Sequence, residues 1–135
     1  MADQAPLAFA SKKWLWAGYL CSALPVALLV FSAGMKLAKP PGMTEGFAHL
    51  GYPLRLALGL GILELACTAL YVLPRTSVLG AILLTGYLGG ATATHLRVGD
   101  PFIAPAVLGV LVWGGLYFRE GRLRALLPIR REGGS

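Results

Sequence analysis

The residues best suited to chemistry are ionisable side chains that interrupt long apolar segments. Glu64 lies eleven positions after Pro53 and ten before Pro74, so it sits ~15 Å from either end of a helix that rises ~1.5 Å per residue. If that helix spans a membrane, a carboxylate at its centre is costly unless it is protonated, paired or hydrated, and such groups are functional candidates. The alternative is structural: a hydrogen-bonded carboxyl group that holds two helices together.

The segment 77–97 carries a polar stripe, and a tyrosine at the depth of Glu64. Thr85, Thr92 and His95 fall within about 80° of arc on an α-helix. Tyr87 lies about ten residues from the start of this segment, close to the depth of Glu64. We therefore expect Tyr87 to donate a hydrogen bond to Glu64.

Lys36, His95 and Arg97 lie near one end of their apolar segments, and we expect them on the outer side of the membrane. They would then line a pocket that opens outward and has Glu64 at its floor. Snorkelling of Lys36 and Arg97 to the headgroups, with an interfacial His95, is the alternative. The nominal depths of Lys36 and Glu64 differ by more than ~10 Å, so a direct ion pair between them stays open. The candidate ligand-binding residues are Lys36, Glu64, Tyr87, Thr92, His95 and Arg97.

Four apolar segments must position these residues. The chain is 56% hydrophobic and 13% charged, whereas soluble domains carry roughly 25% charged residues. Spanning a bilayer as a helix takes roughly 17–20 residues, and the segments at 14–38, 53–73, 77–97 and 102–119 are of that length. The first segment is longer than the core of a signal peptide, so we expect it to be retained. The sequence predicts an all-α integral membrane protein with four transmembrane helices in one domain, 14–119.

The distribution of positive charge predicts the orientation. One side of the membrane would hold eight of the twelve lysines and arginines, and the positive-inside rule then places both termini in the cytoplasm. The predicted location is the inner membrane, with cytoplasmic tails at 1–13 and 120–135. The basic tail at 118–135 suits the anionic leaflet of the bilayer. The net charge of +6 is explained by this distribution, and we expect no nucleic-acid partner. The eight residues are Lys12, Lys13, Arg75, Arg119, Arg122, Arg124, Arg130 and Arg131.

Short connections make neighbouring helices antiparallel, which predicts an up-down four-helix bundle. The outer connection contains TEGFAHL at 44–50, which suits a short interfacial helix. Gly86 and Gly90, followed by Ala93, are small residues on one helix face and predict close helix packing, either within the bundle or in a homo-oligomer.

Cys21 and Cys67 each lie seven residues from the cytoplasmic end of a helix. They suit either a redox pair or two small buried residues. There is no CxxC motif, and the two histidines, His49 and His95, are a weak basis for a metal site. We therefore expect no metal.

Several motifs resemble the DoxX-like family of small bacterial four-helix membrane proteins, over about residues 30–125. They are GMKL, GYP, LGILELAC, LPRT and, most specifically, GAILLTGYLGGATATHLRVGDP at 80–101. The family takes its name from the small membrane subunit of a thiosulfate:quinone oxidoreductase. Other members are grouped with respiratory or stress-linked redox complexes, and more distant relatives act as membrane assembly factors. Lys36, Glu64, His95 and Arg97 fall on motif positions, and the resemblance transfers no catalytic role to them.

The resemblance and the polar pocket together predict an accessory or quinone- or lipid-binding subunit of a membrane redox system. A quinone is the cofactor compatible with this prediction, and a redox protein or a client membrane protein is the compatible partner. The alternative is a non-enzymatic chaperone or scaffold. Transport of protons or small solutes is less favoured, because it rests on Glu64 alone and the chain lacks an inverted repeat. No nucleophile with its base, phosphate loop or haem ligand pair is visible, so autonomous catalysis is not expected.

Overall fold

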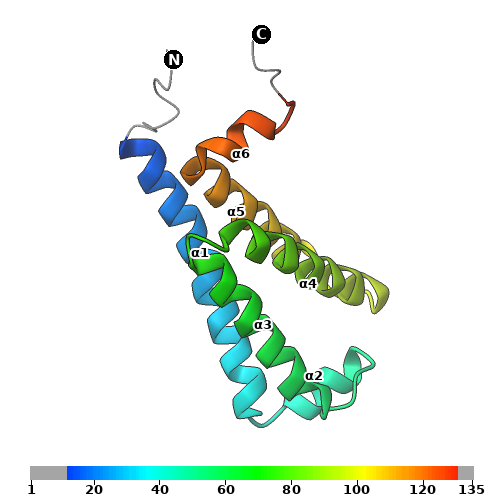
Figure 1. Cartoon of the computed structure of the whole chain (residues 1–135). Coiled ribbons are helices and arrows are strands. Elements are labelled where there is room, and N and C mark those ends of the chain that lie inside the picture. Colours follow the sequence, from blue (N-terminus) through cyan, green and yellow to red (C-terminus); the bar gives the residue numbers. More distant parts are fainter. Residues whose placement is uncertain (1–11, 131–135) are drawn as a thin grey trace, which may run out of the picture.

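The computed structural model describes residues 12–130, and six helices account for most of them (Figure 1). They are α1 (Lys12–Ala38), α2 (Met43–His49), α3 (Leu56–Val72), α4 (Ser77–Arg97), α5 (Ile103–Arg119) and α6 (Gly121–Leu126). Residues 12–130 contain no strand, and the predicted all-helical class is confirmed. Most of the predicted amino-terminal tail, and Arg131 with the residues after it, lie outside the described residues.

Each of the four apolar segments forms one helix, with ends close to the predicted ones. The largest difference is the start of α3, which begins at Leu56 and not at Pro53. Short-range bonds from the Leu56 amide to the Pro53 carbonyl, 3.1 Å, and from the Ala57 amide to the Leu54 carbonyl, 2.9 Å, form a turn there instead. Among the described helices, α1 and α4 are long and apolar enough to cross a membrane, while α3 and α5 are shorter apolar helices of 17 residues.

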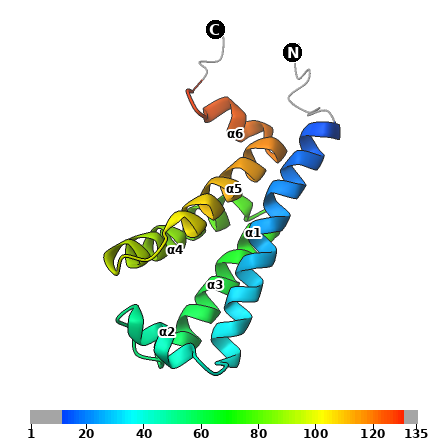
Figure 2. The ribbon, with the colours of Figure 1, turned by 180° about the vertical axis from the view of Figure 1, so that it is seen from behind.

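The four long helices form a ring of neighbours. Helix α1 packs against α3 and α5, and α4 packs against the same two helices. Both views show two pairs, α1 with α3 and α4 with α5, which meet where α1 begins and α5 ends and then diverge (Figures 1 and 2). We call this meeting point the closed end. The opposite end, where α2 and the α4–α5 turn lie, is the open end.

A buried hydroxyl network joins three helices near the closed end. The Tyr71 hydroxyl on α3 donates to the Val112 carbonyl on α5 at 2.7 Å and pairs with the Ser22 hydroxyl on α1 at 2.8 Å. Since a phenol has one proton, Ser22 is the donor in the second bond. Tyr71 is only 1% exposed, so the network lies inside the apolar core.

Glycines at the closed end allow the helix backbones to touch. A Cβ atom on Gly80 would clash with the backbone of Tyr71, and one on Gly115 would clash with Ser22. By contrast, a Cβ atom on Gly86 or Gly90 would meet nothing within 4 Å. The predicted packing through Gly86 and Gly90 is therefore wrong within the single chain, because the helix pairs have already diverged there.

Ala93, the third residue of that predicted stripe, is exposed. Contact of the stripe with a second copy of the chain stays a prediction.

Candidate functional site

An ion pair between α1 and α3 forms the centre of the candidate site. The Lys36 Nζ atom lies 2.8 Å from the Glu64 Oε2 atom and donates a second hydrogen bond to the Ser32 hydroxyl at 2.6 Å. Glu64 is 1% exposed, and the Lys36 side chain is 17% exposed. A buried carboxylate thus faces a cation that still reaches the surface of a cavity.

Local sequence explains how these two residues meet. Gly61 lies almost one turn before Glu64, and a Cβ atom on it would lie 3.2 Å from the Ala33 carbonyl and from the Lys36 Cβ atom. The absence of a side chain there lets α1 approach α3. The late start of α3 also reduces the depth of Glu64 by ~4–5 Å, and the flexible four-carbon stem of Lys36 spans the remainder. The direct ion pair between Lys36 and Glu64, which the sequence could not decide, is therefore present.

Tyr87 brings α4 into the cluster. Its hydroxyl donates to Glu64 Oε2 at 3.1 Å, as the sequence predicted, and the Ser32 hydroxyl lies 3.4 Å from the same oxygen. The Lys36 Nζ atom also lies 6.0 Å from the centroid of the Tyr87 ring. One carboxylate oxygen therefore connects three helices, and Tyr87 is the member that crosses between the two helix pairs.

A cavity of about 790 Å³ opens between the diverging pairs and contains this cluster in its wall. Lys36, Glu64, Tyr87 and His95 all line it, whereas most of its remaining surface is apolar. The apolar lining includes Leu29, Phe31, Met35, Phe47, Leu60 and Leu108, from α1, α2, α3 and α5. The structure thus brings four of the six candidate residues to one cavity.

His95 enters the cavity wall in a defined orientation. Its Nδ1 atom lies 2.7 Å from the Ala91 carbonyl oxygen, one turn earlier on α4. A carbonyl only accepts hydrogen bonds, so Nδ1 carries a proton and the tautomer is fixed. The Nε2 atom has no hydrogen-bond partner among residues 12–130 and is the ring atom left for a ligand.

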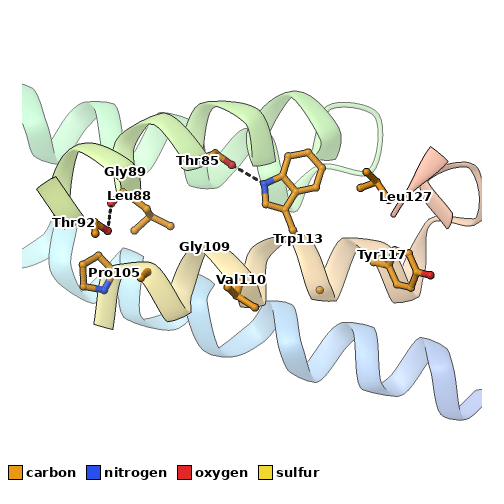
Figure 3. Close-up of a pocket in the computed structure, with 12 residues that line it drawn as sticks. Thr85, Leu88, Gly89, Thr92, Pro105, Gly109, Val110, Trp113, Tyr117 and Leu127 are labelled. Atoms are coloured by element: carbon orange, nitrogen blue, oxygen red, sulfur yellow. Dashed lines mark hydrogen bonds between the residues drawn. The ribbon is translucent and has the colours of Figure 1, made fainter. Parts of the chain in front are cut away.

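Thr92 and Arg97 do not line this cavity. Thr92 lines a separate groove between α4 and α5, and its hydroxyl donates to the Leu88 carbonyl at 2.8 Å (Figure 3). Arg97 donates to the Leu50 carbonyl after α2. The predicted stripe from Thr85 through Thr92 to His95 does not face one site, because its 80° of arc is divided between the two sides of α4.

Contacts at the open end join the α2 region to α4 and the turn after it. His49 Nε2 lies 2.9 Å from both oxygens of Asp100, and the Tyr52 hydroxyl lies 3.0 Å from that of Thr94. Together with the bond from Arg97, these contacts bridge the mouth of the cavity. Sequence reasoning placed Arg97 at the outer end but predicted none of these contacts.

Ser32 is the site residue that sequence reasoning missed. It lies four positions before Lys36, and residues at that spacing are neighbours on a helix surface. Extending the polar face of residues 14–38 by one turn would have found it. Cys67 is buried, Cys21 is half-buried, and both are free. Within residues 12–130, no three His, Cys, Asp or Glu side chains come together as metal ligands would.

Comparison with known proteins indicates the same family as the sequence motifs around the site. A model of the DoxX-like family matches residues 20–115, a range that contains every residue of the Lys36–Glu64 cluster and the whole of α4. No curated protein and no solved structure shows significant similarity to the chain. Since the match covers well over half of the sequence, the chain belongs to the DoxX-like family, a family of membrane-associated proteins.

Proposed function

We propose that α1, α3, α4 and α5 all cross the inner membrane, with the closed end in the cytoplasm. The surface supports this placement, because large apolar side chains on all four helices are exposed. A soluble monomer rarely exposes so much apolar surface, whereas lipid is its natural surrounding. At 17 residues, α3 and α5 lie at the lower limit for a span. Examples of the exposed side chains are Leu20, Phe31, Ile62, Leu63, Leu79, Ile82, Ile103 and Val110.

Within that placement, the chain binds a lipid-soluble molecule with a polar head group. One observation carries this proposal: the Lys36 ammonium group lies in the wall of a mostly apolar cavity with one donor left over. An ammonium group has three N–H donors, and Glu64 and Ser32 accept two of them. The third can reach an acceptor on a ligand. Ligand pockets are typically ~300–1,000 Å³, mostly apolar, with a few placed polar groups.

A quinone fits this set of groups. Its carbonyl oxygens are hydrogen-bond acceptors that match the spare donor of Lys36, and its apolar tail matches the leucines and aromatic residues of the wall. Bound here, a quinone would supply electron transfer coupled to proton transfer. The chain's own part is to orient the head group through Lys36, to hold Lys36 in place through Glu64 and Ser32, and to exclude water. This makes the chain an accessory subunit that presents its ligand to a partner redox protein.

The test is binding of a short-chain benzoquinone to the full chain in mild detergent, measured by calorimetry. Gly90→Leu places a side chain in the cavity without a clash, since nothing lies within 4 Å of its Cβ position. It leaves the ion pair intact and should weaken binding at least tenfold. Lys36→Met should weaken binding by ~10-fold or more, the value of one hydrogen bond from a charged donor.

The matched controls lie outside the cavity. Lys39→Met removes an exposed lysine three residues away, and Gly34→Leu adds a leucine at an open position on the same helix. Both should bind as the parent does. Binding unchanged by Gly90→Leu, or no quinone binding by a folded parent, would overturn the proposal. A co-purifying protein retained in the absence of any bound lipid-soluble ligand would instead establish the scaffold role.

A further inference from the structure

A second concave surface runs between α4 and α5 and adjoins the Glu64 cavity at Leu88 and Pro105. This groove has a volume of about 570 Å³, and its walls are apolar apart from two threonines and the polar atoms of Trp113 and Tyr117 (Figure 3). From Pro105 to Tyr117 the groove follows α5 for ~18 Å, slightly more than half of a ~30 Å hydrocarbon core. Its length therefore matches one leaflet of a bilayer.

The polar groups of the groove are already used within the protein. The Thr85 hydroxyl donates to the Ala81 carbonyl at 2.7 Å and accepts from Trp113 Nε1 at 2.6 Å (Figure 3). The Thr92 hydroxyl donates to the Leu88 carbonyl. Nothing along the groove is therefore left to bind a polar molecule, and only the Tyr117 hydroxyl, at the closed end, has no partner among the described residues.

Glycines keep the groove wide. Gly89 on α4 and Gly114 on α5 line it, and a Cβ atom on either would meet nothing within 4 Å. These positions pack against no part of the described chain. The groove is an apolar channel with smooth walls, which suits a flexible hydrocarbon chain.

The closed end, where the groove finishes at Tyr117 and Leu127, carries a high density of unpaired positive charge. The ion pairs within residues 12–130 are Lys36–Glu64 and His49–Asp100, and both lie elsewhere. Among residues 12–130, the one acid at this end is Glu120, which caps α6 by accepting from the Arg122 amide at 3.3 Å. Seven described cations belong to the segments at this end, which are the start of α1, the α3–α4 turn, the end of α5 and α6 with the residues after it: Lys12, Lys13, Arg75, Arg119, Arg122, Arg124 and Arg130.

Two of these cations are held in place by the protein itself. Arg124 Nη1 donates to the carbonyls of Tyr117 and Phe118 at 2.9 and 2.8 Å, which fixes its guanidinium group beside the last turn of α5. Arg119 lies between the rings of Tyr19 and Tyr71, 5.8 and 5.5 Å from their centroids, and its buried Nε atom has no hydrogen-bond partner. Fixed guanidinium groups without acids suit a phosphate, which accepts paired hydrogen bonds from arginine.

We propose that this face binds an anionic phospholipid, with one acyl chain in the α4–α5 groove and the phosphate at the arginines of the closed end. The apolar groove and the cationic end meet at Tyr117, as the two halves of such a lipid require. The site shares only the apolar residues Leu88 and Pro105 with the lining of the Glu64 cavity, and none of that cavity's polar groups. It depends on the membrane placement of α4 and α5 but not on the identity of the ligand in that cavity.

Native mass spectrometry of the detergent-purified full chain tests the site. Phosphatidylglycerol and phosphatidylcholine with identical acyl chains are added separately, and the lipid-bound fraction is measured. The parent should bind phosphatidylglycerol at least fivefold more tightly. Gly114→Leu should fill the groove and lower the binding of both lipids, while Arg122→Gln with Arg124→Gln should remove the preference for phosphatidylglycerol.

Matched controls separate these effects from general damage. Gly59→Leu adds a leucine at an open position on α3, and Arg55→Gln removes a cation at the open end. Both should bind lipid as the parent does, and all variants should melt within a few degrees of it.

Three results would overturn the proposal. The first is equal binding of the two lipids by the parent, which would leave the arginines without a role. The second is complete competition by inorganic phosphate, which would indicate a free-anion site. The third is a dimer that disappears in Gly114→Leu, which would assign the groove to a second copy of the chain.

Discussion

Removing Lys36 should destabilise the fold far more than its partial exposure suggests. Lys36→Met leaves the Glu64 carboxylate, 1% exposed, with only the neutral donors Tyr87 and Ser32 at 3.1 and 3.4 Å. Breaking a buried ion pair by removing one partner costs about 3–5 kcal/mol. We expect Lys36→Met to lower the free energy of unfolding by that amount.

The reverse substitution should cost less, because the two partners are not equally buried. In Glu64→Gln the isosteric amide still accepts from Tyr87, and the Lys36 side chain, 17% exposed, can turn toward the cavity. We expect a loss of about 1–2 kcal/mol, near the value of one ordinary hydrogen bond. The double variant has no unpaired charge left, so its loss should be only about 2 kcal/mol, and the coupling free energy about 2–5 kcal/mol.

Unfolding of the four proteins by denaturing detergent in mixed micelles measures this cycle. Lys39→Met is the control for loss of a lysine stem at the same end of α1, and it should change the free energy of unfolding by less than ~0.5 kcal/mol. Additive effects of the two substitutions would refute the reasoning. So would a Lys36→Met variant as stable as Lys39→Met, since both results require that Glu64 does not depend on Lys36.

Three further outcomes are expected. Gly80→Ala should destabilise the chain by about 2–3 kcal/mol through overpacking against the Tyr71 backbone. Gly59→Ala, at an open helical position, should stabilise it by up to ~1 kcal/mol, and thermal unfolding of the two variants compares them. Tyr71→Phe should cost about 1–3 kcal/mol, because it leaves the buried Ser22 hydroxyl without its partner and removes the side-chain bond to the Val112 carbonyl. Tyr117→Phe should cost less than ~0.5 kcal/mol, and equal losses would contradict this account of the network. A reporter fused after Ser135 should be active in the cytoplasm, and a periplasmic signal would reverse the proposed orientation.

The helices could be predicted from the sequence because their signal is one of composition. Apolar segments punctuated by proline and glycine define four helices, and their ends deviate by only a few residues. The short helix predicted near TEGFAHL is also present, as α2 (Met43–His49). The Tyr87–Glu64 hydrogen bond was predictable for a similar reason, since helix rise alone places the two residues at one depth. Helix α6 was missed, because six residues in a basic tail carry no comparable signal.

The remaining features depend on how helices approach one another, which composition does not determine. The Lys36–Glu64 pair exists because Gly61 admits α1 and because α3 begins late, and neither fact can be derived from spacing. The same limit explains the error at Gly86 and Gly90. A glycine pair indicates that a backbone can approach closely, but not whether one does. In this chain the close contacts belong to single glycines, Gly80 and Gly115, near the closed end.

Because the two helix pairs diverge from a tight contact, a small change in the angle between them produces a larger displacement at their far ends. The pivot of such a movement is the tight contact of Gly80 with Tyr71, and α4 extends ~25 Å beyond it. A rotation of ~5° about that pivot displaces the far tip by ~2 Å, and displaces Tyr87, seven residues along α4, by ~1 Å. The hydrogen bond from Tyr87 to Glu64, 3.1 Å long, does not survive such a stretch. The contacts from Arg97, Thr94 and Asp100 to the α2 region, at the far tip, depend on the same angle. A change in the angle between the pairs would therefore alter the mouth of the cavity and the charge environment of Glu64 together.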